Sequence, residues 1–254
     1  MKKDFRKIRY LGKSLEDVFF PRRCPICDDV IPYGEPPDTI GSLACRCCLR
    51  ELSFIQGPTC RKCGRALSEA NKGSGLCSDC SRHIRMFERS FALLSYGPLE
   101  RDIMSDIKYR SKRSSADLFS LLAARRFRGE LSELSPDCII PVPVHKNRLR
   151  KRGYNQAALF ARDIARHTGI PFREDLLIRS LETKAQKGLG YEGRILNLQG
   201  AFLADSSACR DVRSLVLVDD IYTTGSTLEA CTEELLRAGV GKVYGLCICA
   251  GRDT

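Results

Sequence analysis

One stretch decides the fold prediction: Leu215-Val216-Leu217-Val218-Asp219-Asp220-Ile221-Tyr222-Thr223-Thr224-Gly225-Ser226-Thr227-Leu228. Its four leading apolar residues predict a buried strand, and the good helix formers from Leu228 onwards predict a helix. A strand followed at once by a helix is typical of an open α/β sheet, in which ligands bind beyond the carboxyl ends of the strands. We therefore expect a ligand site between this strand and this helix.

The polar residues of this stretch suit a phosphorylated sugar. Asp219 and Asp220 can accept hydrogen bonds from two neighbouring sugar hydroxyls. The loop that follows can surround a phosphate with backbone N–H groups and hydroxyls at the positive end of the helix, and it consists of Thr223, Thr224, Gly225, Ser226 and Thr227. Gly225 allows a positive φ and a close approach of the backbone. The alternative is a buried strand and a capped helix with two solvated carboxylates.

The stretch resembles the 5-phosphoribosyl 1-pyrophosphate (PRPP) motif of type I phosphoribosyltransferases. The rest of the chain after residue 88 alternates between apolar runs and helical spacing. We expect strands at residues 90–96, 137–144, 176–178, 201–203 and 242–249, and helices at residues 99–109, 115–127 and 155–167. This alternation predicts an α/β fold with a mostly parallel, doubly wound sheet. The resemblance implies that the sheet is of the type I phosphoribosyltransferase kind.

Cysteines dominate residues 24–80 and predict a metal-binding module. Eight of them form four C-x-x-C pairs: Cys24/Cys27, Cys45/Cys48, Cys60/Cys63 and Cys77/Cys80. Each pair can direct two sulfurs at one ion, and four thiolates complete a tetrahedral zinc site. Metal would supply folding energy to a segment with few large apolar residues. Disulfides, which the reducing cytoplasm disfavours, and a redox C-x-x-C motif are the alternatives.

Four pairs suit two structural zinc ions. Sequential pairing (first with second, third with fourth) is the simpler arrangement, and an interleaved cross-brace stays open. The spacing favours Cys48 over the adjacent Cys47 as a ligand. We expect a basic segment at residues 1–20, a zinc-binding module at residues 21–88 and a phosphoribosyltransferase-like domain at residues 89–254.

Composition and charge indicate a cytoplasmic protein with phosphate-rich partners. The formal net charge is +11, which favours a nucleotide-like substrate or a nucleic acid. No apolar run approaches the ~20 residues that span a bilayer, so we expect no membrane insertion. The basic residues at the start of the chain are not followed by the apolar core of a signal peptide.

A second candidate site lies in residues 141–155. Its five cations occur with no acidic residue among them: Lys146, Arg148, Arg150, Lys151 and Arg152. Such a loop can neutralise a pyrophosphate, because guanidinium groups bind phosphate oxygens in pairs. A solvated basic loop and a contact with a nucleic-acid backbone are the alternatives.

Several motifs occur in an order that resembles the ComF family over roughly residues 18–250. They are the cysteine module, Ile107-Lys108-Tyr109, Val142-Pro143-Val144 with the basic run, Gly153-Tyr154-Asn155-Gln156, Thr183-x-x-Gln186 with Arg194 and Asn197, and the Asp219-Asp220 motif. An ordered set of motifs is much more specific than any one of them.

The resemblance implies a role for each matched position. Asp219 and Asp220 would hold the ribose hydroxyls, and residues 223–227 would bind the 5-phosphate. Lys146, Arg148 and Arg152 would contact the pyrophosphate. Residues 180–197 correspond to a mobile loop that closes over the pyrophosphate, with Lys184 and Arg194 as its charged catalytic contacts; an ordinary surface loop is the alternative. For Lys108 we expect an exposed helix lysine, and a position near the pyrophosphate is the alternative.

The resemblance also implies PRPP binding, with Mg²⁺ chelated by its pyrophosphate, and transfer of the phosphoribosyl group to an unidentified acceptor. The reaction would be a displacement at the anomeric carbon through an oxocarbenium-like state. ComF proteins are linked to competence, the uptake of single-stranded DNA. The alternative is a non-catalytic protein of the DNA-import apparatus that binds single-stranded DNA and keeps a residual or sensory PRPP pocket.

Overall fold

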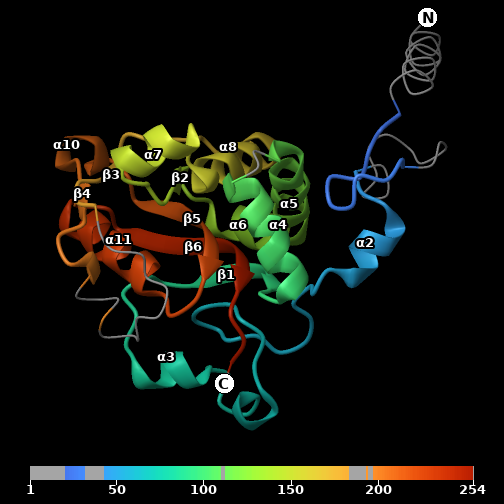
Figure 1. Cartoon of the computed structure of the whole chain (residues 1–254). Helices are drawn as coiled ribbons and strands as arrows, with labels where there is room; N and C mark the ends of the chain where they lie inside the picture. Colours follow the sequence, from blue (N-terminus) through green and yellow to red (C-terminus); the bar gives the residue numbers. More distant parts are fainter. Residues whose placement is uncertain (1–20, 32–42, 110–111, 183–192, 194–196, 254) are drawn as a thin grey trace, which may run out of the picture. The chain divides into compact units, whose positions relative to one another are not determined.

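The computed structural model describes residues 21–31, 43–109, 112–182, 193 and 197–253. The chain forms two compact units, Met1–Leu52 and Ser53–Thr254. The first contains one group of four cysteines and the short helix α2 (Arg46–Glu51). The second contains the sheet, the helices that cover it and the other group of four cysteines (Figure 1).

A four-stranded, fully parallel sheet is the centre of the second unit. Its strand order is β1-β6-β5-β2. The strands are β1 (Ser90–Ser95), β2 (Cys138–Pro141), β5 (Ser214–Tyr222) and β6 (Lys242–Ala250). The predicted fold class, an α/β domain with a mostly parallel sheet beside a small cysteine-rich module, is confirmed.

Strand β5 is longer than the apolar run that predicted it. It continues to Tyr222 because β6 provides partners as far as Ala250. The pairing of β2 with β5 stops before β5 ends, because Pro141, the last residue of β2, lies opposite Val218. Asp219 and Asp220 therefore belong to the strand itself, at a position where the β2 edge has already ended.

Helices cover both faces of the sheet, so it is doubly wound. The longer helices of this unit are α4 (Pro98–Tyr109), α5 (Arg113–Arg126), α6 (Arg128–Leu134), α8 (Gln156–Thr168) and α11 (Ser226–Arg237), of which α5, α8 and α11 pack directly on the strands. Helices α5 and α8 pack on one another and on the strands, while α11 lies across the sheet from them (Figure 1). None of the helices within the described ranges combines the length and the apolar character that crossing a bilayer requires.

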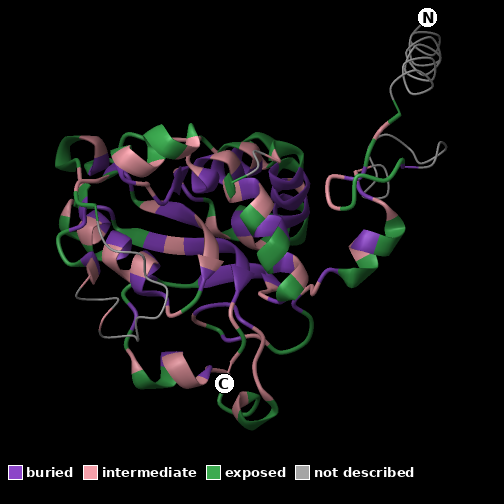
Figure 2. Cartoon of the chain, in the orientation of Figure 1, coloured by how far each residue is buried: buried purple, intermediate pink, exposed green. Residues whose placement is uncertain are grey.

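Burial on both faces explains the unbroken apolar run of β5. Leu215 and Leu217 belong to the cluster that contains Leu228 and Leu235 of α11. Because neighbouring side chains of a strand alternate between faces, Val216 points to the opposite layer. All of these residues are buried, and buried residues follow the central strands in Figure 2. A strand covered on both sides has no polar face, as is usual in parallel sheets.

The two short strands predicted near residues 176 and 201 form a separate antiparallel pair, β3 (Leu177–Arg179) with β4 (Phe202–Ala204). Leu177 and Phe202 are buried against the core cluster, whereas the side chains that alternate with them are exposed. The short helix α10 (Ser206–Cys209) follows β4.

The second cysteine group packs against the sheet domain. Cys60 and Cys63 lie in a tight turn, and Cys77 caps the short helix α3 (Ser78–Arg82), which contains Cys80. A single 3-10 turn, Glu69–Asn71, lies between these two pairs. All four cysteines are buried in the same apolar cluster as β5 and α11. Residue contacts therefore place these four cysteines in the same compact unit as the sheet. The composition of the sequence had suggested a domain boundary after residue 88.

The segment after β6 is tied to this module by Asp253. Its Oδ1 accepts a hydrogen bond of 2.9 Å from the backbone N–H of Ser78, at the start of α3. Its Oδ2 accepts bonds from the Ser68 N–H and hydroxyl at 3.0 Å and from Asn71 Nδ2 at 2.8 Å. Burial acts against the charged form, but these hydrogen bonds outweigh it and lower the pKa of Asp253 to about 2.

We expect Asp253→Asn to destabilise the second unit, because an amide cannot accept all the hydrogen bonds that the carboxylate accepts. Loss of roughly 1 kcal/mol corresponds to a fall of about 2–4 °C in melting temperature for a domain of this size. Thermal unfolding at pH 7 tests this, with Asp211→Asn at an exposed position as the control. An equal melting temperature for Asp253→Asn and the wild type would contradict it.

Candidate functional site

Three charged side chains meet at the end of β5. Lys108 of α4 forms an ion pair with Asp220, through Nζ and Oδ2. The side chains of Lys108 and Asp220 are 23% and 18% exposed. Asp219 Oδ1 accepts a 2.9 Å hydrogen bond from the backbone N–H of Asp220. The expectation of an exposed Lys108 is wrong, because α4 directs this lysine at the carboxylate pair.

Burial and neighbouring charges control the protonation of Asp219 and of Lys108. Burial, followed by the charge of Asp220, raises the pKa of Asp219 to about 8. Burial opposes the charge of Lys108, but the attraction of Asp220 outweighs it and raises the pKa of the lysine. Near neutral pH the pair therefore retains one proton. Such a pair can accept hydrogen bonds from hydroxyl donors.

The loop after β5 has the features of a phosphate-binding turn. Gly225 has a φ of +77°, and an added Cβ would lie 2.3 Å from the hydroxyl of Tyr222. Glycine is therefore required both for the backbone conformation and for space. Thr224 Oγ1 and Ser226 Oγ lie 3.1 Å apart. Ser226 is the first residue of α11, so the loop brings two hydroxyls to the positive end of a 12-residue helix.

The basic stretch after β2 is a helix rather than the loop that was predicted. Helix α7 comprises Lys146–Arg152. His145 caps its first turn by accepting a hydrogen bond at Nδ1 from the Asn147 N–H at 3.3 Å, and Gly153 ends it with a φ of +77°. Lysine and arginine are good helix formers, and the two capping residues outweigh the repulsion between neighbouring cations.

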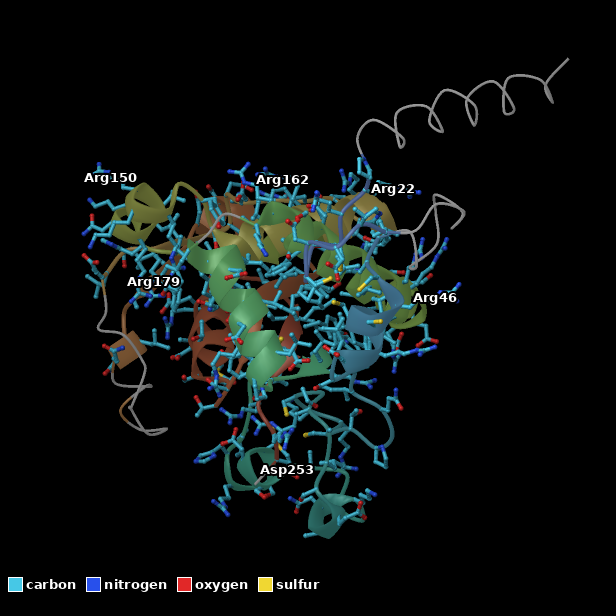
Figure 3. All side chains as sticks on the ribbon, turned by 45° about the vertical axis from the view of Figure 1, so that its right-hand side comes forward. Arg22, Arg46, Arg150, Arg162, Arg179 and Asp253 are labelled. Atoms are coloured by element: carbon cyan, nitrogen blue, oxygen red, sulfur yellow. The ribbon has the colours of Figure 1, made fainter. Side chains whose placement is uncertain are left out.

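This helix divides the cations between two faces. Residues four apart share a face of a helix, which places Arg148 with Arg152 and Lys146 with Arg150. Arg148 and Arg152 are half-buried, whereas Lys146 and Arg150 are exposed, and Arg150 points outward in Figure 3. The run of cations is therefore not one uniform patch.

Arg152 lies close to the carboxylate site. Its Nη1 donates a 2.8 Å hydrogen bond to Gln156 Oε1, and its guanidinium lies 5.2 Å from the ring centre of Tyr109, next to Lys108. Lys146 instead lines a cavity of about 730 Å³ beside the end of β2. Helix α7 thus brings Arg152, one of the predicted pyrophosphate contacts, toward Asp220. It places Lys146, another predicted contact, farther from the carboxylates.

Arg179 is a cation near the site that sequence reasoning did not select. It ends β3, and its guanidinium lies 5.2 Å from the ring centre of Phe202. Burial, and then the charge of Arg148, lower the pKa of Arg179, while the charge of Asp219 acts in the opposite direction. A single arginine at the end of an apolar strand is a weak signal, but it is one that the sequence contains. Lys184 and Arg194, the predicted contacts of the mobile loop, lie outside the described residues.

The eight paired cysteines form two groups of four: Cys24, Cys27, Cys45 and Cys48, and then Cys60, Cys63, Cys77 and Cys80. Sequential pairing is confirmed, the cross-brace is wrong, and Cys48 rather than Cys47 joins the first group. No disulfide joins any of the fourteen cysteines, all of which lie within the described residues. Sulfur–sulfur distances of 3.7 Å (Cys27 to Cys45) and 3.6 Å (Cys63 to Cys77) approach the ~3.8 Å of tetrahedral Zn–S geometry. Both groups fit zinc.

Comparison with known proteins agrees with this arrangement. Residues 15–81 match the family described as the double zinc ribbon domain. The chain is 31% identical over 209 residues to Competence protein F of Haemophilus influenzae, which covers 80% of this chain and 89% of that protein. The chain belongs to the ComF family.

Other ComF relatives are similar over most of their length. The DNA utilization protein YhgH of Escherichia coli K12 is 30% identical, over 75% of this chain and 83% of its own. Competence protein ComFC of Bacillus subtilis is 28% identical, over 77% of this chain and 78% of its own.

Solved structures similar to this chain include phosphoribosyltransferases. A purine phosphoribosyltransferase from Pyrococcus horikoshii matches 50% of this chain and 70% of its own, at 19% identity and a TM-score of 0.33. The glutamine PRPP amidotransferase of Bacillus subtilis matches 54% of this chain and 26% of its own, at 19% identity and a TM-score of 0.37.

The raised pKa of Asp219 predicts a pH-dependent effect of Asp219→Asn on stability. The folded protein holds a proton up to about pH 8, whereas an unfolded aspartate has a pKa of 3.8. The folded state binds more protons between these values, so the free energy of unfolding of the wild type falls as pH rises through this range. The asparagine variant lacks this loss and should gain stability relative to the wild type from pH 6 to pH 8.

Denaturant unfolding at pH 6, 7, 8 and 9 measures this difference, which should stop growing above pH 8. The control is Asp102→Asn, an exposed aspartate of α4. A difference for Asp219→Asn that stays constant with pH would contradict the raised pKa.

Proposed function

We propose that this ComF protein binds PRPP at the end of β5 and transfers its phosphoribosyl group to an acceptor. The observation that carries the proposal is the continuous order of carboxylate pair, glycine turn and helix start from Asp219 to Ser226. The two carboxylates can accept hydrogen bonds from the two ribose hydroxyls, and the loop is suited to the 5-phosphate. The names of the relatives favour a role in competence or DNA utilization for the same protein.

The chain's residues would act mainly by positioning and by charge. Asp219 and Asp220 accept hydrogen bonds from the ribose hydroxyls and orient the anomeric carbon. That carbon loses its bond to pyrophosphate, which leaves with the electron pair, and gains a bond to the acceptor, which supplies a lone pair and releases any proton on the attacking atom to solvent. Arg148 and Arg152 face inward and would offset the charge that develops on the departing pyrophosphate. Mg²⁺ would enter with PRPP, chelated by the same pyrophosphate.

The decisive experiment is thermal unfolding with PRPP and Mg²⁺. A ligand that binds only the folded state stabilises it by mass action, so the wild type should melt at a higher temperature as PRPP is added. Asp220→Asn removes the charge of a hydroxyl acceptor, and Thr224→Ala removes a loop hydroxyl. Both should reduce the shift, by an amount equivalent to about a tenfold loss of affinity for each hydrogen bond to a charged group.

Asp102→Asn is the matched control, because it removes the same charge from the exposed surface of α4. Ribose 5-phosphate and pyrophosphate, each added alone, separate the two halves of the ligand. If the shift in Asp220→Asn and Thr224→Ala equals that of the wild type, the site is misplaced. If the wild type shows no shift, PRPP is not the ligand.

A second proposal is that the outward face of α7 binds single-stranded DNA. Arg150 and Lys151 are exposed on it, away from the half-buried Arg148 and Arg152. Cations in this arrangement can contact successive phosphates without entering the sugar-phosphate site. The net charge of +11 favours the same type of partner.

The double variant Arg150→Ala with Lys151→Ala should weaken binding to an oligonucleotide and make it less sensitive to salt. For every phosphate that the variant no longer neutralises, the slope of log K against log salt should decrease by about 0.7. The control is Arg210→Ala with Lys242→Ala, which removes the same charge near the start of β6, at the opposite end of the sheet. If the two double variants have equal slopes, DNA binding depends on net charge alone, and the outward face of α7 is not the binding site.

A further inference from the structure

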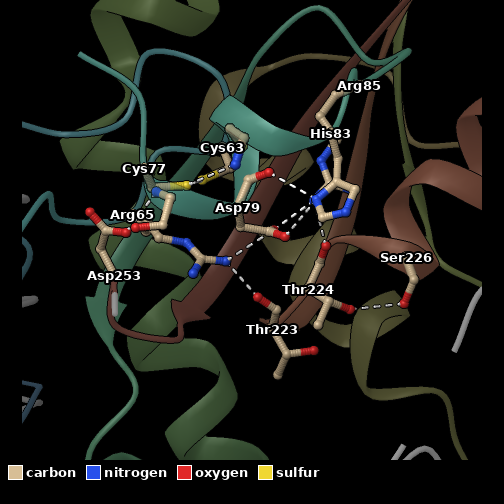
Figure 4. A network of polar contacts seen from close by, with 12 residues as sticks. Cys63, Arg65, Cys77, Asp79, His83, Arg85, Thr223, Thr224, Ser226 and Asp253 are labelled. Carbon is tan, nitrogen blue, oxygen red and sulfur yellow. Dashed lines mark hydrogen bonds and ion pairs between the residues drawn. The ribbon is translucent and has the colours of Figure 1, made fainter. Parts of the chain in front are cut away.

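Two buried arginines connect the second cysteine group (Cys60, Cys63, Cys77 and Cys80) to the loop at residues 223–227, the proposed phosphate loop (Figure 4). Arg65 follows Cys63 by two residues, and its Nη2 donates a 2.5 Å hydrogen bond to the backbone carbonyl of Thr223. Arg85 lies just beyond α3, and its Nη2 donates a 2.9 Å bond to the carbonyl of Thr224. The side chains of Arg65 and Arg85 are 7% and 0% exposed.

Asp79 holds both guanidinium groups from the side of the cysteine module. Its Oδ2 lies 2.6 Å from Arg85 Nη2 and 3.8 Å from Arg65 Nη2. Arg65 also lies 5.3 Å from the ring centre of Tyr222, the last residue of β5. A buried guanidinium needs such partners, because its desolvation is costly. Each arginine is therefore fixed at both ends, by the module and by the loop.

These contacts decide which way the loop amides point. A trans peptide is planar, and its C=O and N–H point in opposite directions. When Arg65 holds the Thr223 carbonyl, the N–H of Thr224 points away from the cysteine module. When Arg85 holds the Thr224 carbonyl, the N–H of Gly225 does the same. Backbone amides turned outward at the start of α11 are the donors that a phosphate requires.

The position of Asp79 depends on the fold of the cysteine group. Asp79 lies in the five-residue helix α3, which begins after Cys77 and contains Cys80. The Cys80 N–H donates to Cys77 Sγ at 3.4 Å. Helices this short are not stable alone, and a Cys₄ zinc site supplies folding energy to the segment that binds the ion. Loss of zinc from this group would release Asp79, and with it the two arginines.

We propose that Arg65 and Arg85 are positioning residues of the phosphate loop, and that the second cysteine group acts through them on PRPP affinity. This inference rests on the proposed function, because it assigns these residues to the same site. The two groups of four cysteines then differ in role. Only the group of Cys60, Cys63, Cys77 and Cys80 supports the loop, and the other group lies in the first compact unit.

The first test uses Arg65→Lys and Arg85→Lys, which keep the charge and lose the forked geometry. Three quantities are measured on the full-length protein: PRPP affinity by calorimetry, zinc per chain, and hydrogen exchange of residues 222–228. We expect PRPP affinity to fall about tenfold and exchange in the loop to accelerate, with two zinc ions per chain retained. Arg82→Lys, on the exposed side of α3, is the matched control and should change none of the three.

The outcomes separate this inference from the proposed function. If the wild type binds PRPP and the two variants bind it equally well with zinc retained, Arg65 and Arg85 do not position the loop. If the wild type binds no PRPP, the proposed function fails, and hydrogen exchange alone decides the inference. Faster exchange in the variants then supports the tie between module and loop, and unchanged exchange overturns it.

The second test compares the two cysteine groups. Cys80→Ser and Cys27→Ser should each reduce the zinc content from two ions to one. Only Cys80→Ser should also lower PRPP affinity and accelerate exchange of residues 222–228. Equal effects of the two variants on the loop would overturn the assignment of this role to the second group.

Discussion

The negative charge of Asp219 and Asp220 lies at the end of a strand whose central residues are completely buried. A strand in such a position normally ends in uncharged residues, because burying charge is costly. Here the cost is reduced by the ion pair with Lys108 and by a proton that the pair retains near neutral pH. The inward face of α7 and the end of β3 add further cations around it. The site is thus arranged around two carboxylates whose charge is balanced by Lys108, by a retained proton and by these nearby cations.

The loop after these carboxylates depends on contacts from outside the sheet. Gly225 provides the backbone conformation, but its neighbours are oriented by Arg65 and Arg85, which reach them from the cysteine module. A zinc module of this kind is usually described as an independently folding domain, because it folds around its own metal ion. In this protein the second group of four cysteines packs on the same apolar cluster as β5 and α11. The fold of this group and the geometry of the loop at residues 223–227 are therefore connected through Arg65 and Arg85.

Residue patterns predicted the buried strands and the cysteine pairs well. They predicted the structure around the charged residues less well. The apolar run of residues 215–218 and the spacing of the C-x-x-C pairs have direct structural meanings, and both predictions agree with the structure. The cations of residues 146–152 were predicted as a loop because they lack apolar periodicity. They form α7 because His145 and Gly153 cap it. Lys108 was expected to be exposed, since nothing near it in the sequence identifies its partner 112 residues away.

The sequence by itself determined the order of strand, carboxylate pair, hydroxyl-rich loop and helix, and it determined the four cysteine pairs. Those features are local, because they depend on residues within a few positions of one another. Only the tertiary structure decided that Lys108 faces Asp220, that Arg148 and Arg152 share an inward face, and that Arg65 and Arg85 hold the loop carbonyls. These contacts join segments that are distant along the chain. Packing on the sheet brings them together, and no pattern of neighbouring residues encodes that packing.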